Sequence, residues 1–258
     1  MDLPYLAVIM DLDRTLLRTD KSVSEYTLGV LREWREAGAY LFAATARPER
    51  AITAYRELIG FDAVTTLNGA RTITSGGVTE NAIGSEHAAA ILKELEEIDG
   101  AVISVEAENG IYANAEIPLW QPEVMRNLSR LTEQQKIYKI LASHPEISPE
   151  EILIRLPDGV YSTVADKKLR QYMSLAATKW AGITRMLRDA GLSAGQAVYF
   201  GDDNDDLEPI VRCGYGVAVG NALDHVKEAA DEVTQSNDDD GVARCLERLM
   251  SRAKAENN

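Results

Sequence analysis

Short apolar segments that end at acidic residues are the feature that most constrains the fold of this sequence. The segment YLAVIM at 5–10 is followed by Asp11 and Asp13, and the segment at 196–203 ends in acids that include Asp202. A strand without polar alternation is typical of the centre of a parallel sheet, where helices bury both of its faces. Both segments therefore predict central strands with acidic residues at their carboxyl ends.

Helices and further strands alternate with these two segments. Up to residue 70 the pattern predicts a helix that Ser24 caps and Gly38 ends, a strand at 40–45, a helix at 47–60 and a strand at 63–70. After residue 177 it predicts a helix at 178–191, a strand at 214–222 and helices at 223–230 and 241–256. This alternation implies an α/β fold with a doubly wound, Rossmann-like parallel sheet.

The stretch at 84–174 departs from that alternation. Its pattern predicts helices at 86–100, 122–131 and 133–143, a hairpin around Asn109-Gly110, and a second hairpin that joins 151–156 to 159–164. Antiparallel hairpins mixed with helices indicate a separate α+β unit. We therefore expect a core formed by 1–83 and 175–258, with an inserted α+β domain at 84–174.

The charge balance limits the partners of the chain. The 258 residues include 27 Lys and Arg against 41 Asp and Glu, which gives a net charge of −14. Such acidity argues against nucleic acid and anionic membranes as partners, because both require a basic surface. A small anionic substrate is not excluded, because it needs only local positive charge or a metal ion.

The compartment that we expect is the cytoplasm. Cys213 and Cys245 are too few for a disulfide framework, which favours a reducing environment. The amino-terminal residues lack the basic region of a signal peptide, and no segment has the ~20 apolar residues that a membrane span requires. The sequence does not predict an oligomeric state.

Residues with catalytic or binding potential follow the predicted strands and open one helix: Asp11, Asp13, Thr15, Thr45, Arg47, Asn68, Gly69, Lys179 and the acidic run 202–206. Ligands of a doubly wound sheet bind at the carboxyl ends of its strands, so these side chains are expected to converge. Clustered carboxylates repel one another unless a cation lies among them, and hard oxygens favour Mg²⁺ over zinc. An EF-hand starting at Asp202 fails, because Leu207 and Cys213 replace the Gly and Glu that it requires.

Three segments and one lysine resemble, in order, the four motifs of the haloacid dehalogenase (HAD) superfamily of phosphatases. They are DLDRT at 11–15, ATAR at 44–47, Lys179 and GDDNDD at 201–206. Further segments resemble its Cof-type branch: LNGA at 67–70, VAVGNA at 217–222, VKEAADEVT at 226–234 and SNDDDGVA at 236–243. Members of that branch carry a large α/β cap inserted after the third core strand. The resemblance covers nearly the whole chain and implies that 84–174 is a cap that selects the substrate.

The resemblance also implies a role for each motif. Asp11 would be the nucleophile that forms an aspartyl-phosphate, and Asp13 would be the general acid and base. Mg²⁺ would be held by the Asp11 carboxylate, the Asp13 backbone carbonyl and Asp202. The residues that would contact phosphate or substrate are Thr45, Arg47, Lys179 and Asp205.

Three residues depart from the usual pattern of that superfamily. Arg14 and Ala46 replace glycines, and Asp205 replaces a common asparagine. An ionised carboxylate cannot donate a hydrogen bond to phosphate, so Asn204 or an altered metal shell would have to compensate. These departures keep open the alternative of a catalytically degenerate protein that binds a metal or another ligand.

The function that these observations predict is a Mg²⁺-dependent phosphomonoester phosphatase for a small phosphorylated metabolite, such as a sugar phosphate or a phosphorylated cofactor. A phosphomutase or other phosphotransferase would use the same aspartyl-phosphate, and the sequence does not separate the two. A response-regulator receiver also combines acidic residues with Thr and Lys, but it is much shorter and has no cap.

Overall fold

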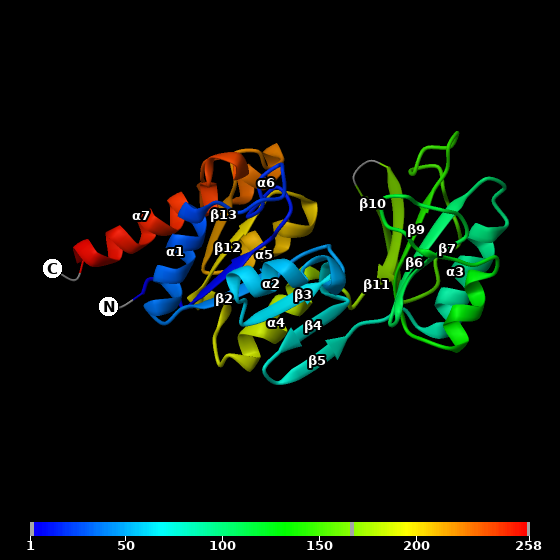
Figure 1. The fold of residues 1–258 in the computed structure, drawn as a ribbon, viewed down its shortest axis with the longest axis horizontal. Coiled ribbons are helices and arrows are strands. Elements are labelled where there is room, and N and C mark those ends of the chain that lie inside the picture. The colour runs from blue at the N-terminus through cyan, green and yellow to red at the C-terminus, as the bar shows by residue number, and fades with distance from the viewer. Residues whose placement is uncertain (1–2, 166–167, 257–258) are drawn as a thin grey trace. The chain divides into compact units, whose positions relative to one another are not determined.

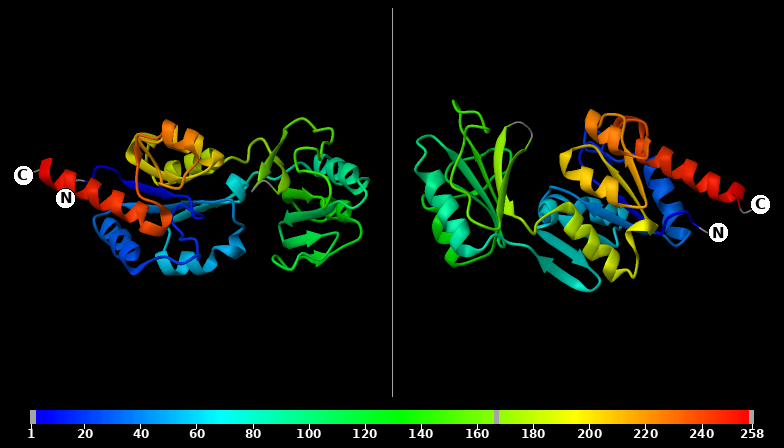
Figure 2. Two further views of the ribbon diagram at one scale, coloured as in Figure 1. Left: turned by 90° about the horizontal axis from the view of Figure 1, so that it is seen from above. Right: turned by 180° about the vertical axis from the view of Figure 1, so that it is seen from behind.

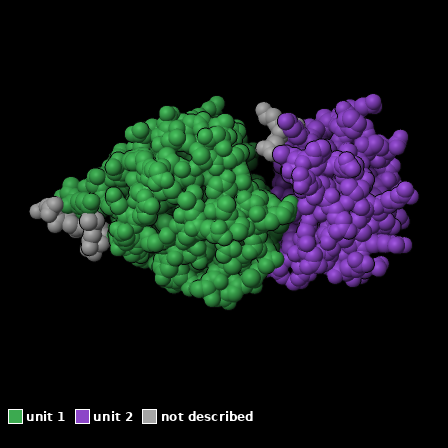
Figure 3. Space-filling model, in the orientation of Figure 1, with its two compact units in different colours: residues 1–79, 178–258 green, residues 80–177 purple. Residues whose placement is uncertain are grey.

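The computed structural model describes residues 3–165 and 168–256, which form two compact units (Figure 1). Unit 1 comprises Met1–Thr79 and Thr178–Asn258, and unit 2 comprises Glu80–Ala177 (Figure 3). Unit 2 therefore interrupts the sequence of unit 1.

Among the described residues, the centre of unit 1 is an eight-stranded sheet with the order β14-β13-β12-β1-β2-β3-β4-β5. Neighbouring strands from β14 to β3 run parallel, and β4 runs antiparallel to β3. The strands are β1 (Ala7–Met10), β2 (Tyr40–Ala44), β3 (Ala63–Thr66), β4 (Arg71–Thr74), β5 (Gly77–Glu80), β12 (Ala197–Gly201), β13 (Tyr215–Ala218) and β14 (Glu232–Val233). This parallel-rich sheet confirms the predicted α/β class.

Helices cover both faces of this sheet (Figure 2). One face carries α1 (Glu25–Glu36), α2 (Thr53–Ile59) and α7 (Gly241–Glu256), and the other carries α4 (Lys179–Asp189), α5 (Leu207–Arg212) and α6 (Asp224–Ala229). The Ser24 hydroxyl caps α1 by accepting from Thr27 N at 3.0 Å, and Trp34 Nε1 joins α1 to α7 by donating to Leu246 O at 3.2 Å. None of the described helices combines the length and the hydropathy of a membrane-spanning segment.

Close packing at Gly182 fixes the position of α4 against the sheet. A β-carbon at this residue would lie 2.1 Å from Oγ1 of Thr65, which is itself 2.8 Å from Oγ1 of Thr72 on β4. We expect Gly182→Ala to lower the free energy of unfolding by about 1–3 kcal/mol, because the added methyl group forces the helix away from the sheet. Urea denaturation followed by tryptophan fluorescence measures this change.

Gly29→Ala in α1 is the matched control for that prediction. Nothing lies within 4 Å of a β-carbon built at Gly29. Because alanine is favoured over glycine inside a helix, this variant is expected to raise the free energy of unfolding by up to about 1 kcal/mol. Equal shifts in the two variants would contradict the explanation from close packing.

Unit 2 contains, in its described part, a six-stranded sheet with the order β10-β11-β9-β6-β7-β8. The strands are β6 (Val102–Ala107), β7 (Gly110–Ala113), β8 (Glu123–Val124), β9 (Ile137–Ser143), β10 (Val160–Ala165) and β11 (Leu169–Ser174). Helix α3 (Ser85–Glu96) contributes Ile91 and Leu95 to a core that includes Val105 and Ile140 of the sheet. β6 and β7 form the predicted hairpin around Asn109-Gly110.

Both helices predicted between 122 and 143 are wrong. Residues 122–131 contain the short strand β8 and the first residues of a 3₁₀ helix at Leu128–Glu133. Most of 133–143 is strand β9, which lies between β11 and β6 and is buried along nearly its whole length. A strand buried on both faces shows no alternation, so periodicity cannot distinguish it from a buried helix.

The hairpin predicted between 151–156 and 159–164 is also wrong. Residues 151–156 form no strand, and β10 pairs with β11 in an antiparallel ladder instead. The Pro157-Asp158-Gly159 signal does form a turn, in which Val160 N donates to Pro157 O at 3.3 Å. That turn leads into β10 and does not join two strands. The connection from β10 to β11 includes 166–167, which lie outside the described residues.

Candidate active site

Two central strands bring acidic residues from distant parts of the sequence to one edge of the unit 1 sheet. β1 and β12 are parallel neighbours, with Met10 opposite Phe200. Asp11 and Asp202 directly follow these strands and are only 5% and 4% exposed. The parallel pairing therefore places two buried carboxylates next to each other at the carboxyl ends of the strands.

Asp206 completes an acidic cluster with Asp11 and Asp202, although the sequence analysis gave it no role. One carboxylate oxygen of each residue lies within 4.8 Å of those of the other two. Asp206 Oδ2 accepts hydrogen bonds from the backbone amides of Asp202 at 2.9 Å and Asp203 at 3.1 Å. Asp203 and Asp206 form a capping box at a helix start, an arrangement that their spacing in the sequence does not specify.

Lys179 supplies positive charge to the acidic cluster. It is the first residue of α4, whose N-cap Thr178 accepts from Ala181 N at 3.0 Å. Its Nζ donates to Asp11 Oδ1 at 2.8 Å and to Asp206 Oδ1 at 2.6 Å. Burial by itself would lower the pKa of Lys179, but the two carboxylates outweigh burial and raise this pKa well above its ordinary value. Lys179 is therefore charged at neutral pH.

The acidic cluster contains more carboxylates than Lys179 alone can neutralise. Burial raises the pKa of Asp11 well above its ordinary value; Lys179 opposes this shift, and Asp206 and Asp202 add to it. Burial also raises the pKa of Asp202 to about 7, with a further contribution from Asp206. Three buried carboxylates beside one lysine, all of them hard oxygen donors, fit a divalent cation.

The carboxylate of Asp13 pairs with two cations. Arg47 donates to it from Nε at 2.5 Å and from Nη2 at 2.7 Å, and Lys21 Nζ donates at 2.6 Å. Burial alone would raise the pKa of Asp13, but the hydrogen bonds from Arg47 and Lys21 outweigh burial and lower this pKa to about 2. Arg47 also lies over the ring of Tyr55, 5.4 Å from its centroid. Asp13 is thus ionised, and it orients Arg47.

Thr45 and Asn68 connect the ends of β2 and β3 to the acidic run. Thr45 is buried; its carbonyl accepts from Asn68 N at 3.0 Å, and its Oγ1 accepts from Arg47 N at 3.2 Å. The side-chain amide of Asn68 donates to Asp205 Oδ2. Asp205 is therefore bound to Asn68, which lies two residues beyond the end of β3.

Asn204 does not take the place of Asp205 in this arrangement. Its amide nitrogen donates to Asp203 Oδ1 at 3.1 Å, and its amide oxygen is 2.8 Å from His225 Nε2. Asn204 is exposed, and its side-chain amide is held by Asp203 and His225.

Arg14 adopts a backbone conformation that glycine favours. Its φ of 60° lies in the left-handed region, where a side chain costs roughly 1–2 kcal/mol, and this accounts for the glycine that the resembling superfamily commonly has here. Asn221 Nδ2 donates to Arg14 O at 2.8 Å, and Arg14 Nε lies 3.7 Å from Asp202 Oδ2. Arg14 therefore adds a second cation beside the acidic cluster. Ala46 has no positive φ, so its side chain introduces no comparable strain.

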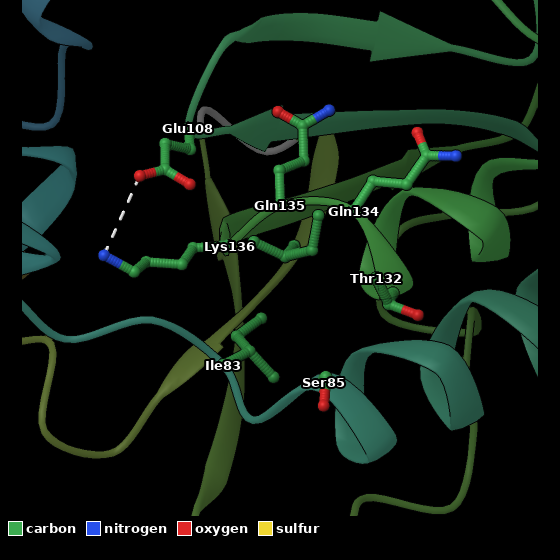
Figure 4. Close-up of a pocket in the computed structure, with 8 residues that line it drawn as sticks. Ile83, Ser85, Glu108, Thr132, Gln134, Gln135 and Lys136 are labelled. Carbon is green, nitrogen blue, oxygen red and sulfur yellow. Dashed lines mark ion pairs between the residues drawn. The ribbon is translucent and has the colours of Figure 1, made fainter.

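A cavity of about 320 Å³ lies within unit 2 (Figure 4). Its lining residues are Ile83, Ser85, Glu108, Thr132, Gln134, Gln135, Lys136 and Ile137. Glu108 Oε1 is 3.8 Å from Lys136 Nζ, so the acid of this lining is paired with a base. None of the acidic-cluster residues lines this cavity.

Comparisons with known proteins agree on one family. The family profile described as haloacid dehalogenase-like hydrolase matches residues 8–246. The 5-amino-6-(5-phospho-D-ribitylamino)uracil phosphatase YitU of Bacillus subtilis is 26% identical over 270 residues, which cover 96% of this chain and 98% of YitU. The phosphatase YcsE of the same organism, named for the same substrate, is 24% identical over 251 residues, covering 95% of this chain and 96% of YcsE.

Solved structures show the same fold. A protein from Geobacillus kaustophilus superposes with a TM-score of 0.84 at 24% identity, covering 95% of this chain and 99% of the other. A sugar phosphatase of HAD subclass IIB superposes with a TM-score of 0.80 at 22% identity, covering 94% and 98%. At identities of 24% and 22%, the similarity to these two structures shows a shared fold.

Proposed function

Because the chain belongs to the family of haloacid dehalogenase-like hydrolases, we propose that it is a Mg²⁺-dependent phosphatase that hydrolyses the phosphomonoester of a small metabolite. The observation that carries this proposal is the acidic cluster at the ends of β1 and β12, in which Lys179 donates to both Asp11 and Asp206. Buried carboxylates beside a fixed cation attract a metal ion and, through it, an anionic phosphate.

We assign the nucleophile to Asp11. Lys179 binds one of its carboxylate oxygens at 2.8 Å and so fixes the orientation of the carboxylate. Attack of an Asp11 oxygen on phosphorus forms the aspartyl-phosphate and breaks the bond to the leaving alcohol. Water then cleaves this intermediate, which releases inorganic phosphate and restores Asp11.

Asp13 is the proposed general acid and base. It would protonate the leaving alkoxide and then take a proton from the hydrolytic water. In the substrate-free structure the hydrogen bonds from Arg47 and Lys21 lower the pKa of Asp13 to about 2, which favours its ionised form. An anionic phosphate ester competes with Asp13 for Arg47, so we propose that substrate binding draws Arg47 away and raises the pKa of Asp13.

The metal ion would be held by the carboxylates of Asp11 and Asp202 and by the backbone carbonyl of Asp13. When bound, Mg²⁺ supplies positive charge that stabilises the transferring phosphoryl group. Thr45 and Lys179 would bind phosphate oxygens. Asp205 accepts from Asn68, which favours a role for Asp205 in positioning Asn68 at the substrate over direct donation to phosphate.

We propose that unit 1 is the catalytic core and that unit 2 is the cap that selects the substrate. Two curated relatives that match nearly the whole chain are named for a phosphorylated ribitylamino-uracil, and a structural relative is named a sugar phosphatase. These names support a phosphate ester of a sugar, a polyol or a cofactor precursor as the substrate class.

Phosphate release from a panel of such esters tests the proposal. We expect release to require Mg²⁺, to stop with excess chelator and to return when Mg²⁺ is restored, because phosphoryl transfer here depends on the cation. No release from any ester by protein that still binds Mg²⁺ would contradict the phosphatase and favour a ligand-binding protein. Transfer to a sugar that requires a bisphosphate activator would identify a mutase.

A further inference from the structure

Tyr199 contacts the acidic cluster but has none of the roles proposed above. It lies on the central strand β12, and its side chain is completely buried. Its hydroxyl donates to Asp206 Oδ1 at 2.5 Å. A phenylalanine would fill the same space, so the feature to be explained is the single oxygen that this tyrosine brings to Asp206.

Asp206 has a hydrogen-bond donor at each of its acceptor positions. Its Oδ1 accepts from Tyr199 and Lys179, and its Oδ2 accepts from the amides of Asp202 and Asp203. An ionised carboxylate offers about four acceptor positions, so these donors fill them. Asp206 therefore cannot bind a metal ion directly without losing one of its donors.

The other two carboxylates of the acidic cluster are less fully occupied. Among the described residues, the hydrogen bond to the Asp11 carboxylate comes from Lys179, and the one to the Asp202 carboxylate comes from Thr15 at 3.0 Å. Each of these carboxylates has acceptor positions left for a cation. The cluster thus contains two carboxylates with acceptor positions open to a metal ion, Asp11 and Asp202, and one whose positions are filled, Asp206.

We propose that the Tyr199 hydroxyl keeps Asp206 hydrogen-bonded to Lys179 and thereby prevents Asp206 from becoming a ligand of the metal ion. This inference rests on the proposed metal site, which then offers two carboxylates to a cation instead of three. Mg²⁺ keeps several waters and is bound through one or two carboxylates, whereas Ca²⁺ takes about six to eight oxygen ligands in flexible geometry. Tyr199 is therefore a positioning residue that favours Mg²⁺ over Ca²⁺ and holds Lys179 against Asp11.

Tyr199→Phe tests this proposal by removing one buried oxygen. Calorimetric titration of the metal-free protein measures the affinities for Mg²⁺ and Ca²⁺ separately from turnover. With an acceptor position open, Asp206 can become a ligand for Ca²⁺, so we expect the Ca²⁺ affinity to rise about tenfold and the Mg²⁺ affinity to change by less than about threefold. We also expect kcat to fall about tenfold at unchanged KM, because Lys179 loses its fixed arrangement.

Tyr172→Phe is the matched control, because it removes a buried phenol oxygen from unit 2. Tyr172 is 1% exposed and donates to Ile152 O at 3.3 Å. This variant is expected to keep the wild-type ratio of Ca²⁺ to Mg²⁺ affinity and the wild-type kcat.

Three results would overturn the proposal, and they are distinguishable. Unchanged affinities for both ions in Tyr199→Phe overturn it alone, while the proposed function stands. An equal loss of both affinities together with a lower Tm would show that the hydroxyl merely supports the fold. A wild-type protein that binds neither ion would contradict the proposed metal-dependent function as well.

Discussion

Asp11→Asn is expected to abolish phosphate release, with kcat at least about 10³-fold below that of the wild type. The substitution preserves the size of the side chain, which is 5% exposed at the end of β1. It replaces the attacking anionic oxygen by a neutral amide, which cannot form the phosphoryl intermediate. Steady-state assay with the best ester of the panel measures the loss.

The same substitution is not expected to damage the fold. It removes one of three neighbouring buried carboxylates, so mutual repulsion falls and the Tm of the metal-free protein should rise. Asp224→Asn is the control, because Asp224 on α6 has a side chain that is 96% exposed, and both activity and Tm should stay at wild-type values. If Asp11→Asn retained more than a tenth of the wild-type kcat, the assignment of the nucleophile would be wrong.

Lys179→Met should lose both activity and stability. Without Lys179, Asp11 and Asp206 lose hydrogen bonds of 2.8 and 2.6 Å inside a buried site. Removing one partner of a buried ion pair costs about 3–5 kcal/mol, and loss of a fixed donor to the transferring phosphate lowers kcat by about 10²–10³-fold. Thermal unfolding and steady-state kinetics measure the two effects.

Adding Mg²⁺ tests whether Lys179→Met loses stability because buried carboxylates are left without a cation or because the variant misfolds. A cation that binds the excess carboxylates stabilises the folded state by mass action, so added Mg²⁺ should recover Tm more in the variant than in the wild type, without recovering kcat. Lys227→Met is the control, because Lys227 pairs at 3.7 Å with the exposed Asp224, an arrangement worth little. A similar loss of Tm in both variants would refute the role of buried charge.

The position of the acidic cluster could be predicted from the sequence because it follows from the sheet. Apolar runs identified β1 and β12 as buried strands, and parallel strands place their carboxyl ends at one edge. Asp11 and Asp202 follow those runs directly, so their proximity could be predicted from the strands alone, without knowledge of side-chain contacts. Lys179 was identified by its place in a motif, since a lysine at the start of a helix otherwise suggests a solvated side chain.

The remainder of the site depends on geometry that spacing does not contain. Asp203, Asp205 and Asp206 are all acids in one short run, and only the turn after β12 decides that Asp206 points inward. The pairing of Asp13 with Arg47 likewise depends on β1 lying beside β2. In unit 2, strand β9 was missed because burial on both faces removes the alternation that identifies a strand.

The place of unit 2 in the chain also fixes the order in which a ribosome can complete this protein. β1 pairs with β12, with Ala7 opposite Ala197, so the centre of the sheet cannot form until β12 has been synthesised. Glu80–Ala177 is continuous, so all of its strands have been synthesised before α4 begins. Because domains generally fold as units during synthesis, unit 2 is expected to fold while the first strands of unit 1 still lack their partners. The nascent chain therefore cannot bring Asp11 together with Asp206 until all of unit 2 and the strand β12 have been synthesised.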